Sequence, residues 1–172
     1  NKNKTAIHFV PELEEERVQH ITYQELYVRV NEFAALLKET AGLKRGDRVT
    51  IHMPMSAELP ITMLACARIG VIHSVVFGGF SASACADRVI DSNSRVLITM
   101  DSYYRGGKLL DHKGVDDEAC ILAEAGGQKI DRLLVWQRYP GKWSAESPMI
   151  EGRDVVVNEE LKNYYGVRIE PE

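Results

Sequence analysis

Hydrophobic positions alternate between two spacings along most of the chain, and this alternation predicts the architecture. Short, almost continuously apolar runs occur at 48–53, 72–77, 95–100 and 131–136. Between them, apolar residues recur at helical spacing over 56–70, 81–93 and 115–127. Strands that are apolar on both faces and alternate with helices are typical of a parallel sheet covered on both sides. The pattern predicts an α/β fold with a doubly wound, mostly parallel sheet.

A short hairpin and a helix are predicted before this alternation begins. The stretches "TAIHFVPE" (5–12) and "ERVQHIT" (16–22) have the residue types of two short strands, with an acidic turn between them. Thr22 and Glu25 then match a capping box, T-x-x-E, at the start of a helix. The apolar face of this helix consists of Leu26, Val30, Phe33 and Leu37. Gly42 is the expected C-cap.

Capping residues predict where the later helices begin and end. Ser56 is the expected N-cap of helix 56–70, Gly70 its end, and Ser81 the N-cap of helix 81–93. The segment "DHKGVDDE" (111–118) is expected to lead into the next helix as a solvated, acidic start. Its oxygen atoms lack the spacing of a calcium loop.

The regular pattern ends after residue 136. Residues 137–153 are rich in Pro, Gly and Ser and predict a long loop, which inside a domain is usually functional or mobile. The stretch "DVVVNEELKNYYG" (154–166) predicts a short helix. The chain starts "NKNKTAIHF", without a methionine or a targeting pattern. We therefore expect residues 1–172 to be a single, incomplete domain of a longer protein.

Composition excludes several classes of protein. The chain is 45% hydrophobic and 27% charged, which is ordinary for a globular domain, and its net charge of −4 predicts no nucleic-acid partner. No apolar run approaches the roughly 20 residues of a membrane span. The three cysteines, Cys66, Cys85 and Cys120, lie far apart. Their number and spacing predict buried thiols in a cytoplasmic protein and no metal site.

The stretch "FGGFS" (77–81) is the first candidate for chemistry. It joins a predicted strand to a predicted helix, and ligands of doubly wound sheets bind at such carboxyl ends. The helix start offers free N–H groups to an anion. The stretch matches neither G-x-G-x-x-G nor the phosphate loop G-x-x-x-x-G-K-[ST]. Gly78 and Gly79 therefore form either a tight corner or part of a phosphate site.

A second pair of glycines follows the next strand, in "YYRGGK" (103–108). Arg105 and Lys108 flank this pair, one β-α-β unit after Gly78, so the two loops should be adjacent in space. Together they offer an aromatic face at Phe77 and two cations, which suits an adenine and a phosphate. A solvated basic turn explains the same residues. Asp101, just before this loop, is expected to cap it.

At these residues the sequence resembles the adenylate-forming enzymes, in their branch of AMP-forming acetyl-CoA and propionyl-CoA synthetases. The stretches "HSVVFGGFS" (73–81), "YYRGGK", "ITYQELYVRVNEFAALLK" (21–38) and "EGRDVVVNEELKNYYG" (151–166) carry the resemblance through nearly the whole chain. It implies the amino-terminal subdomain of such an enzyme. In this family, ATP and acetate form an acyl-adenylate and pyrophosphate, and CoA then displaces AMP to give the thioester.

The resemblance implies a role in CoA binding for both glycine loops. Phe77 would stack near the adenine of CoA, and Gly78 and Gly79 would line its pocket. Arg105 would contact the 3′-phosphate. The same binding segment includes Gly106, Gly107 and Lys108. Relatives often carry Arg at the position of Lys108, and Lys keeps the charge but not the bidentate geometry.

The resemblance also implies what the 172 residues lack. The parent would use ATP with Mg²⁺, CoA and acetate or propionate. Its phosphate loop, acyl pocket and catalytic lysine would lie in the remaining domains of the parent chain, as partners of this segment. No catalytic or metal-binding residue is expected within 1–172, and the fragment alone should be inactive. The alternative is a free-standing Rossmann-like module that binds CoA or another nucleotide.

Overall fold

A computed structural model describes residues 1–140, 142 and 147–172. Its elements in chain order are β1 (Thr5–Phe9), β2 (Gln19–Thr22), α1 (Tyr23–Glu39), β3 (Arg48–Met53), α2 (Glu58–Arg68), β4 (Ile72–Phe77), α3 (Ala82–Ser92), β5 (Val96–Met100), β6 (Ser102–Arg105), β7 (Lys108–Asp111), α4 (His112–Ala125), β8 (Arg132–Trp136), β9 (Asp154–Val156), α5 (Val157–Glu160) and the 3₁₀ turn η1 (Leu161–Tyr164).

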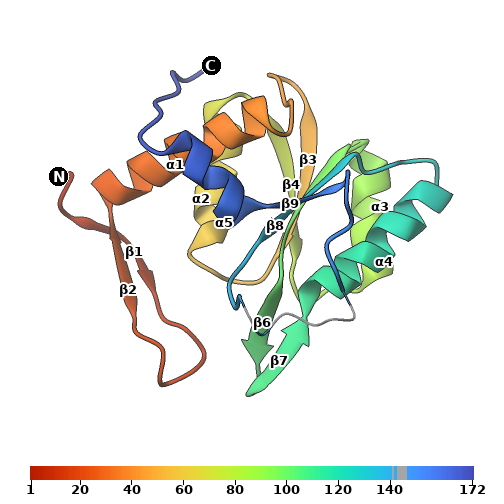
Figure 1. The fold of residues 1–172 in the computed structure, drawn as a ribbon, viewed down its shortest axis with the longest axis horizontal. Coiled ribbons are helices and arrows are strands. Elements are labelled where there is room, and N and C mark those ends of the chain that lie inside the picture. Colours follow the sequence, from red (N-terminus) through yellow and green to blue (C-terminus); the bar gives the residue numbers. More distant parts are fainter. Residues whose placement is uncertain (141, 143–146) are drawn as a thin grey trace.

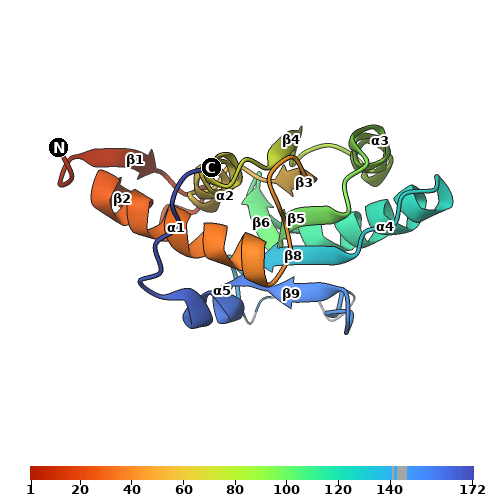
Figure 2. The same ribbon diagram turned by 90° about the horizontal axis from the view of Figure 1, so that it is seen from above.

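A parallel sheet of five strands, in the order β4-β3-β5-β8-β9, forms the centre of the molecule (Figures 1 and 2). The doubly wound α/β fold is confirmed, and so is the N-terminal hairpin, in which β1 and β2 pair antiparallel. The outer strand β9 is a correction, because a helix was predicted from residue 154. Three residues, Asp154–Val156, pair with β8 before the chain turns into α5.

Helices cover both faces of the sheet, as the apolar strands require. Figure 1 shows α1 and α2 on one side and α3 and α4 on the other. Side chains alternate accordingly along β5: Val96, Ile98 and Met100 pack toward α1 and α2, and Leu97 packs toward α3 and α4. Two buried apolar layers, one on each face, therefore fix the strands whose carboxyl ends form the site.

The predicted caps are confirmed for α1 and α3 but not for α2. Thr22 and Glu25 form the reciprocal capping box, and the Ser81 hydroxyl accepts a hydrogen bond from the amide of Ala84. Ser56 is not a cap: α2 begins two residues later, and its N-cap is Ala57, whose side chain makes no hydrogen bond. The predicted C-cap of α1 is also wrong, because Thr40 caps the helix and Gly42 follows with a φ of +64°.

Two corrections concern the segment after β5. The stretch predicted as a loop is a hairpin, in which β6 and β7 pair antiparallel and Arg105 faces Lys108 across a two-residue turn. The next helix starts at His112, three residues before the predicted start, because the Asp111 side chain caps it by accepting from the amide of Gly114. The hairpin projects from the carboxyl edge of the sheet (Figure 1).

The predicted loop 137–153 lies between β8 and β9. Residues 141 and 143–146 fall outside the described part, and the described remainder contains no helix or strand. Within the described residues, no helix combines the length and the apolar character that crossing a membrane requires.

Candidate functional site

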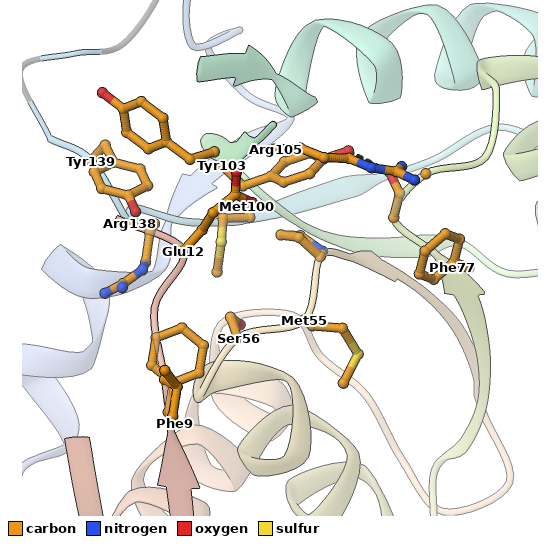
Figure 3. Close-up of a pocket in the computed structure, with 15 residues that line it drawn as sticks. Phe9, Glu12, Met55, Ser56, Phe77, Met100, Tyr103, Arg105, Arg138 and Tyr139 are labelled. Carbon is orange, nitrogen blue, oxygen red and sulfur yellow. Dashed lines mark hydrogen bonds between the residues drawn. The ribbon is translucent and has the colours of Figure 1, made fainter. Parts of the chain in front are cut away.

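A cavity of about 330 Å³ lies at the carboxyl ends of the parallel strands, where ligands bind in doubly wound folds (Figure 3). Its walls come from the ends of β3, β4 and β5, from the β6–β7 hairpin, from the segment after β8 and from the N-terminal hairpin. The lining residues are Phe9, Val10, Glu12, Pro54, Met55, Ser56, Phe77, Gly78, Gly79, Met100, Tyr103, Tyr104, Arg105, Arg138 and Tyr139.

Gly78 lets the end of β4 pack directly on the segment that follows β3. A Cβ atom at this position would lie 2.8 Å from the Met53 carbonyl oxygen and 2.8 Å from the Cα atom of Pro54. The carbonyl of Gly78 accepts a hydrogen bond of 3.2 Å from the hydroxyl of Tyr103 on β6. This bond ties the glycine corner to the hairpin, so the two loops predicted to be adjacent are in contact.

Phe77, Gly79 and Arg105 converge at one end of the cavity. A Cβ atom at Gly79 would lie 2.6 Å from Nη1 of Arg105 and 2.7 Å from Cε1 of Phe77. The guanidinium therefore crosses from the hairpin to a place directly over Gly79. Phe77 is 53% exposed, with an edge-on contact to Phe80. An open aromatic ring and a guanidinium side by side on the wall of a cavity suit a planar, anionic ligand.

The turn of the β6–β7 hairpin carries the remaining predicted residues. Gly106 and Gly107 have φ values of +58° and +74°, as a tight two-residue turn requires. These glycines and Lys108 are exposed at the tip and are not among the residues that line the cavity. Neither Arg105 nor Lys108 forms an ion pair with any residue in the described part of the chain. Two cations without an ion pair among the described residues therefore flank the turn.

The opposite wall was not predicted from the sequence. Arg138, which follows β8, donates to a carboxylate oxygen of Glu16 at 2.6 Å and lies 5.0 Å from the ring centre of Phe9. The Tyr139 hydroxyl donates to Glu16 at 2.5 Å, and burial, followed by this bond, raises the pKa of Tyr139. Arg138 lies at the carboxyl end of a strand, so the rule that selected Phe77 and Arg105 could have identified it.

Asp101 organises the floor of the site. Its carboxylate accepts backbone hydrogen bonds from Ser102 at 2.7 Å, Arg138 at 2.8 Å and Tyr139 at 3.0 Å. Burial raises the pKa of Asp101, and these N–H donors oppose that shift. Asp101 therefore caps the start of the hairpin segment through Ser102, as predicted. It also binds the backbone of the segment after β8 through Arg138 and Tyr139.

The predicted solvated start of α4 is wrong, because Asp116 is completely buried beneath the sheet. Its carboxylate contacts Nδ1 of His52 at 2.6 Å and accepts hydrogen bonds from Thr99 and from the Cys85 thiol. Among the described residues, His52, Cys85 and Asp116 are the one group of three that could hold a metal ion. This nitrogen, sulfur and single-carboxylate set does not fit Mg²⁺, which prefers oxygen ligands.

Comparison with known proteins gives a consistent picture. A family model described as "AMP-binding enzyme" matches residues 1–159. The chain is 48% identical to the acetyl-coenzyme A synthetase of Wolinella succinogenes over 92% of its own length and 23% of that protein. It is 46% identical to the 3-hydroxypropionyl-coenzyme A synthetase of Sulfurisphaera tokodaii, over 99% of the chain and 24% of the relative. The chain thus spans about a quarter of the curated relatives that it matches.

Proposed function

Because this chain belongs to the AMP-binding enzyme family, we propose that its cavity holds the nucleotide end of CoA in an AMP-forming acyl-CoA synthetase. The parent would activate acetate, propionate or another short acid with ATP and transfer the acyl group from the adenylate to CoA. Relatives named for acetyl and 3-hydroxypropionyl groups match the chain at similar identity, so the proposed substrates are short acids as a class.

The observation that carries this proposal is the position of Arg105. Its guanidinium lies over Gly79 and beside Phe77, and no described acidic side chain pairs with it. A guanidinium that is not already paired can bind a phosphate through two parallel N–H···O bonds. We assign Arg105 to the 3′-phosphate of CoA and Phe77 to a contact with the adenine. Gly78 and Gly79 would line the pocket, Gly78 packed on the backbone after β3 and Gly79 beneath the Arg105 guanidinium.

The hairpin turn has a supporting role in this proposal. Gly106 and Gly107 allow the sharp reversal that follows Arg105, and Lys108, which pairs with Arg105 across this turn, adds a second positive charge at the exposed tip of the hairpin. We assign no catalytic residue within the chain. We also predict that the other domains of the parent chain are partners of this segment and that the protein is cytoplasmic.

Calorimetric titration with CoA tests the proposal. We expect Arg105→Ala to weaken CoA binding by roughly tenfold or more, since a charge-assisted phosphate contact contributes about 1.5–3 kcal/mol. Arg88→Ala is the matched control. It removes the same charge, but Arg88 is exposed on α3 and lies outside the cavity. Equal CoA affinity of the unmodified protein, the Arg105 variant and the Arg88 variant would overturn the assignment.

A further inference from the structure

An acidic segment closes one side of the cavity. This segment, residues 10–18 between β1 and β2, contains four glutamates: Glu12, Glu14, Glu15 and Glu16. Glu16 anchors it to the wall after β8 through the ion pair with Arg138 and the hydrogen bond from Tyr139. Val10 and Glu12 line the cavity itself. A net-negative segment is therefore attached to the rim of a site proposed to bind a strongly anionic ligand.

Glu12 occupies the anion-binding position of the hairpin turn. Its Oε1 atom accepts a hydrogen bond of 3.0 Å from the backbone N–H of Gly107. This N–H lies between Arg105 and Lys108, where the positive φ angles of the turn leave it outside the hairpin ladder. Figure 3 shows Glu12 reaching from the acidic segment toward the hairpin. A carboxylate on this N–H occupies a place that a phosphate oxygen could otherwise take.

We propose that Glu12 is a specificity-determining residue that competes with the phosphate of the ligand for the hairpin turn. The proposal rests on the proposed function, and it concerns the control of that same site. Glu12 and Arg105 line the same cavity, so a phosphate on Arg105 would share that cavity with the Glu12 carboxylate, and two like charges repel each other. Binding therefore requires Glu12 to release the Gly107 N–H, which can then donate to the phosphate instead.

This competition weakens the binding only of a ligand that places an anionic group at the hairpin turn. CoA has a 3′-phosphate, and dephospho-CoA is the same molecule without it. Glu12 should therefore lower the affinity for CoA and leave the affinity for dephospho-CoA almost unchanged. Because the anchor is Glu16 and not Glu12, loss of the Glu12 charge should leave the acidic segment in place.

The test compares Glu12→Gln with Glu15→Gln in calorimetric titrations with CoA and dephospho-CoA. Both substitutions remove one negative charge from the same segment. Glu15, however, is exposed and has no hydrogen bond or ion pair with any other described residue. We expect Glu12→Gln to tighten CoA binding by roughly three- to tenfold, with less than a twofold change for dephospho-CoA. Glu15→Gln should change both affinities by less than twofold.

Three results would overturn the role of Glu12: no change in CoA affinity, an equal change for both ligands, or an equal effect of Glu15→Gln. If the unmodified protein and Glu12→Gln both fail to bind CoA at millimolar concentration, the proposed function is wrong. The role of Glu12 is then decided by titrating inorganic phosphate and following the Gly107 amide by NMR. Glu12→Gln should respond at several-fold lower phosphate, and identical midpoints would overturn the competition.

Discussion

Gly78 and Gly79 are neighbours, but a methyl group would meet different obstacles at the two positions. At Gly78 the obstructing atoms belong to the backbone of Met53 and Pro54, which is fixed by the sheet. At Gly79 they belong to the side chains of Arg105 and Phe77, whose ends can move. The first glycine therefore supports the fold, and the second supports the placement of the guanidinium.

Alanine substitutions should separate these two roles. We expect Gly78→Ala to lower the free energy of unfolding by about 1–3 kcal/mol, since overpacking against backbone cannot relax easily. Gly79→Ala should cost less than about 1 kcal/mol of stability but weaken CoA binding several-fold, because Arg105 must leave its position. Urea denaturation and calorimetry measure the two effects. A larger loss of stability for Gly79→Ala than for Gly78→Ala would contradict this distinction.

At the scale of elements, one buried carboxylate connects α4 to the sheet. Asp116 on α4 contacts His52 on β3 and Thr99 on β5, and it also contacts Cys85 on α3. His112, one turn earlier on α4, contacts the His52 carbonyl at 3.0 Å, and its ring packs against Tyr103. Tyr103 in turn bonds to the Gly78 carbonyl. The helix, the hairpin and the glycine corner therefore share one set of polar contacts.

Asp116→Asn should destabilise the protein far more than a surface substitution of the same kind. The substitution replaces the carboxylate, which accepts several buried hydrogen bonds, by an amide that presents N–H groups to the same donors. We therefore expect the free energy of unfolding to fall by about 3 kcal/mol. Asp87→Asn is the matched control, because Asp87 is exposed on α3. Urea denaturation of both variants checks this, and losses of equal size would show that the buried contacts contribute little.

Local signals in the sequence predicted the central elements well but gave a poor account of the segment between β5 and α4. Alternating spacing identified β3, β4, β5 and β8. Of these, β3, β5 and β8 are buried on both faces, whereas β4 is an edge strand whose Ile72, Val75 and Phe77 are exposed. The hairpin was not predicted because Gly106 and Gly107 were interpreted as ligand-binding glycines or as a solvated basic turn, although such a pair also predicts the tight turn between two paired strands. The start of α4 was placed too late because Asp111 was not recognised as its cap.

The remaining errors and omissions depend on contacts that are distant in sequence. Asp116 was expected in solvent because acidic residues usually are, and only the fold brings His52 and Thr99 to it. Strand β9 is three residues long and forms because β8 offers a free edge. Glu12 contacts the hairpin and Glu16 contacts the segment after β8. In both cases the partners are more than 90 positions apart in the sequence, so no local pattern predicts these contacts.

At the scale of the whole molecule, the two apolar layers enclose all three free cysteines. Burial raises the pKa of Cys66 to about 12 and that of Cys120 to about 12, and it also raises the pKa of Cys85. In the unfolded chain these thiols ionise near pH 8.5. The folded protein then holds more protons than the unfolded chain in alkaline solution.

The free energy of unfolding should therefore be insensitive to these thiols below about pH 8.5 and fall as the pH rises toward 12. Each thiol contributes a slope of at most about 1.4 kcal/mol per pH unit. Denaturant titrations between pH 8 and pH 11 measure this slope, and Cys66→Ala should reduce it by up to that amount. An unchanged slope in the variant would mean that Cys66 titrates alike in both states.

The central claim is that the cavity at the carboxyl ends of β3, β4 and β5 holds the nucleotide end of CoA. The most direct test is an NMR titration of the isotope-labelled protein with CoA, followed amide by amide. The account predicts the largest shifts at Gly78, Gly79 and Gly107, and almost none at Gly127, at the end of α4. Shifts that centre elsewhere, or none at millimolar CoA, would contradict it.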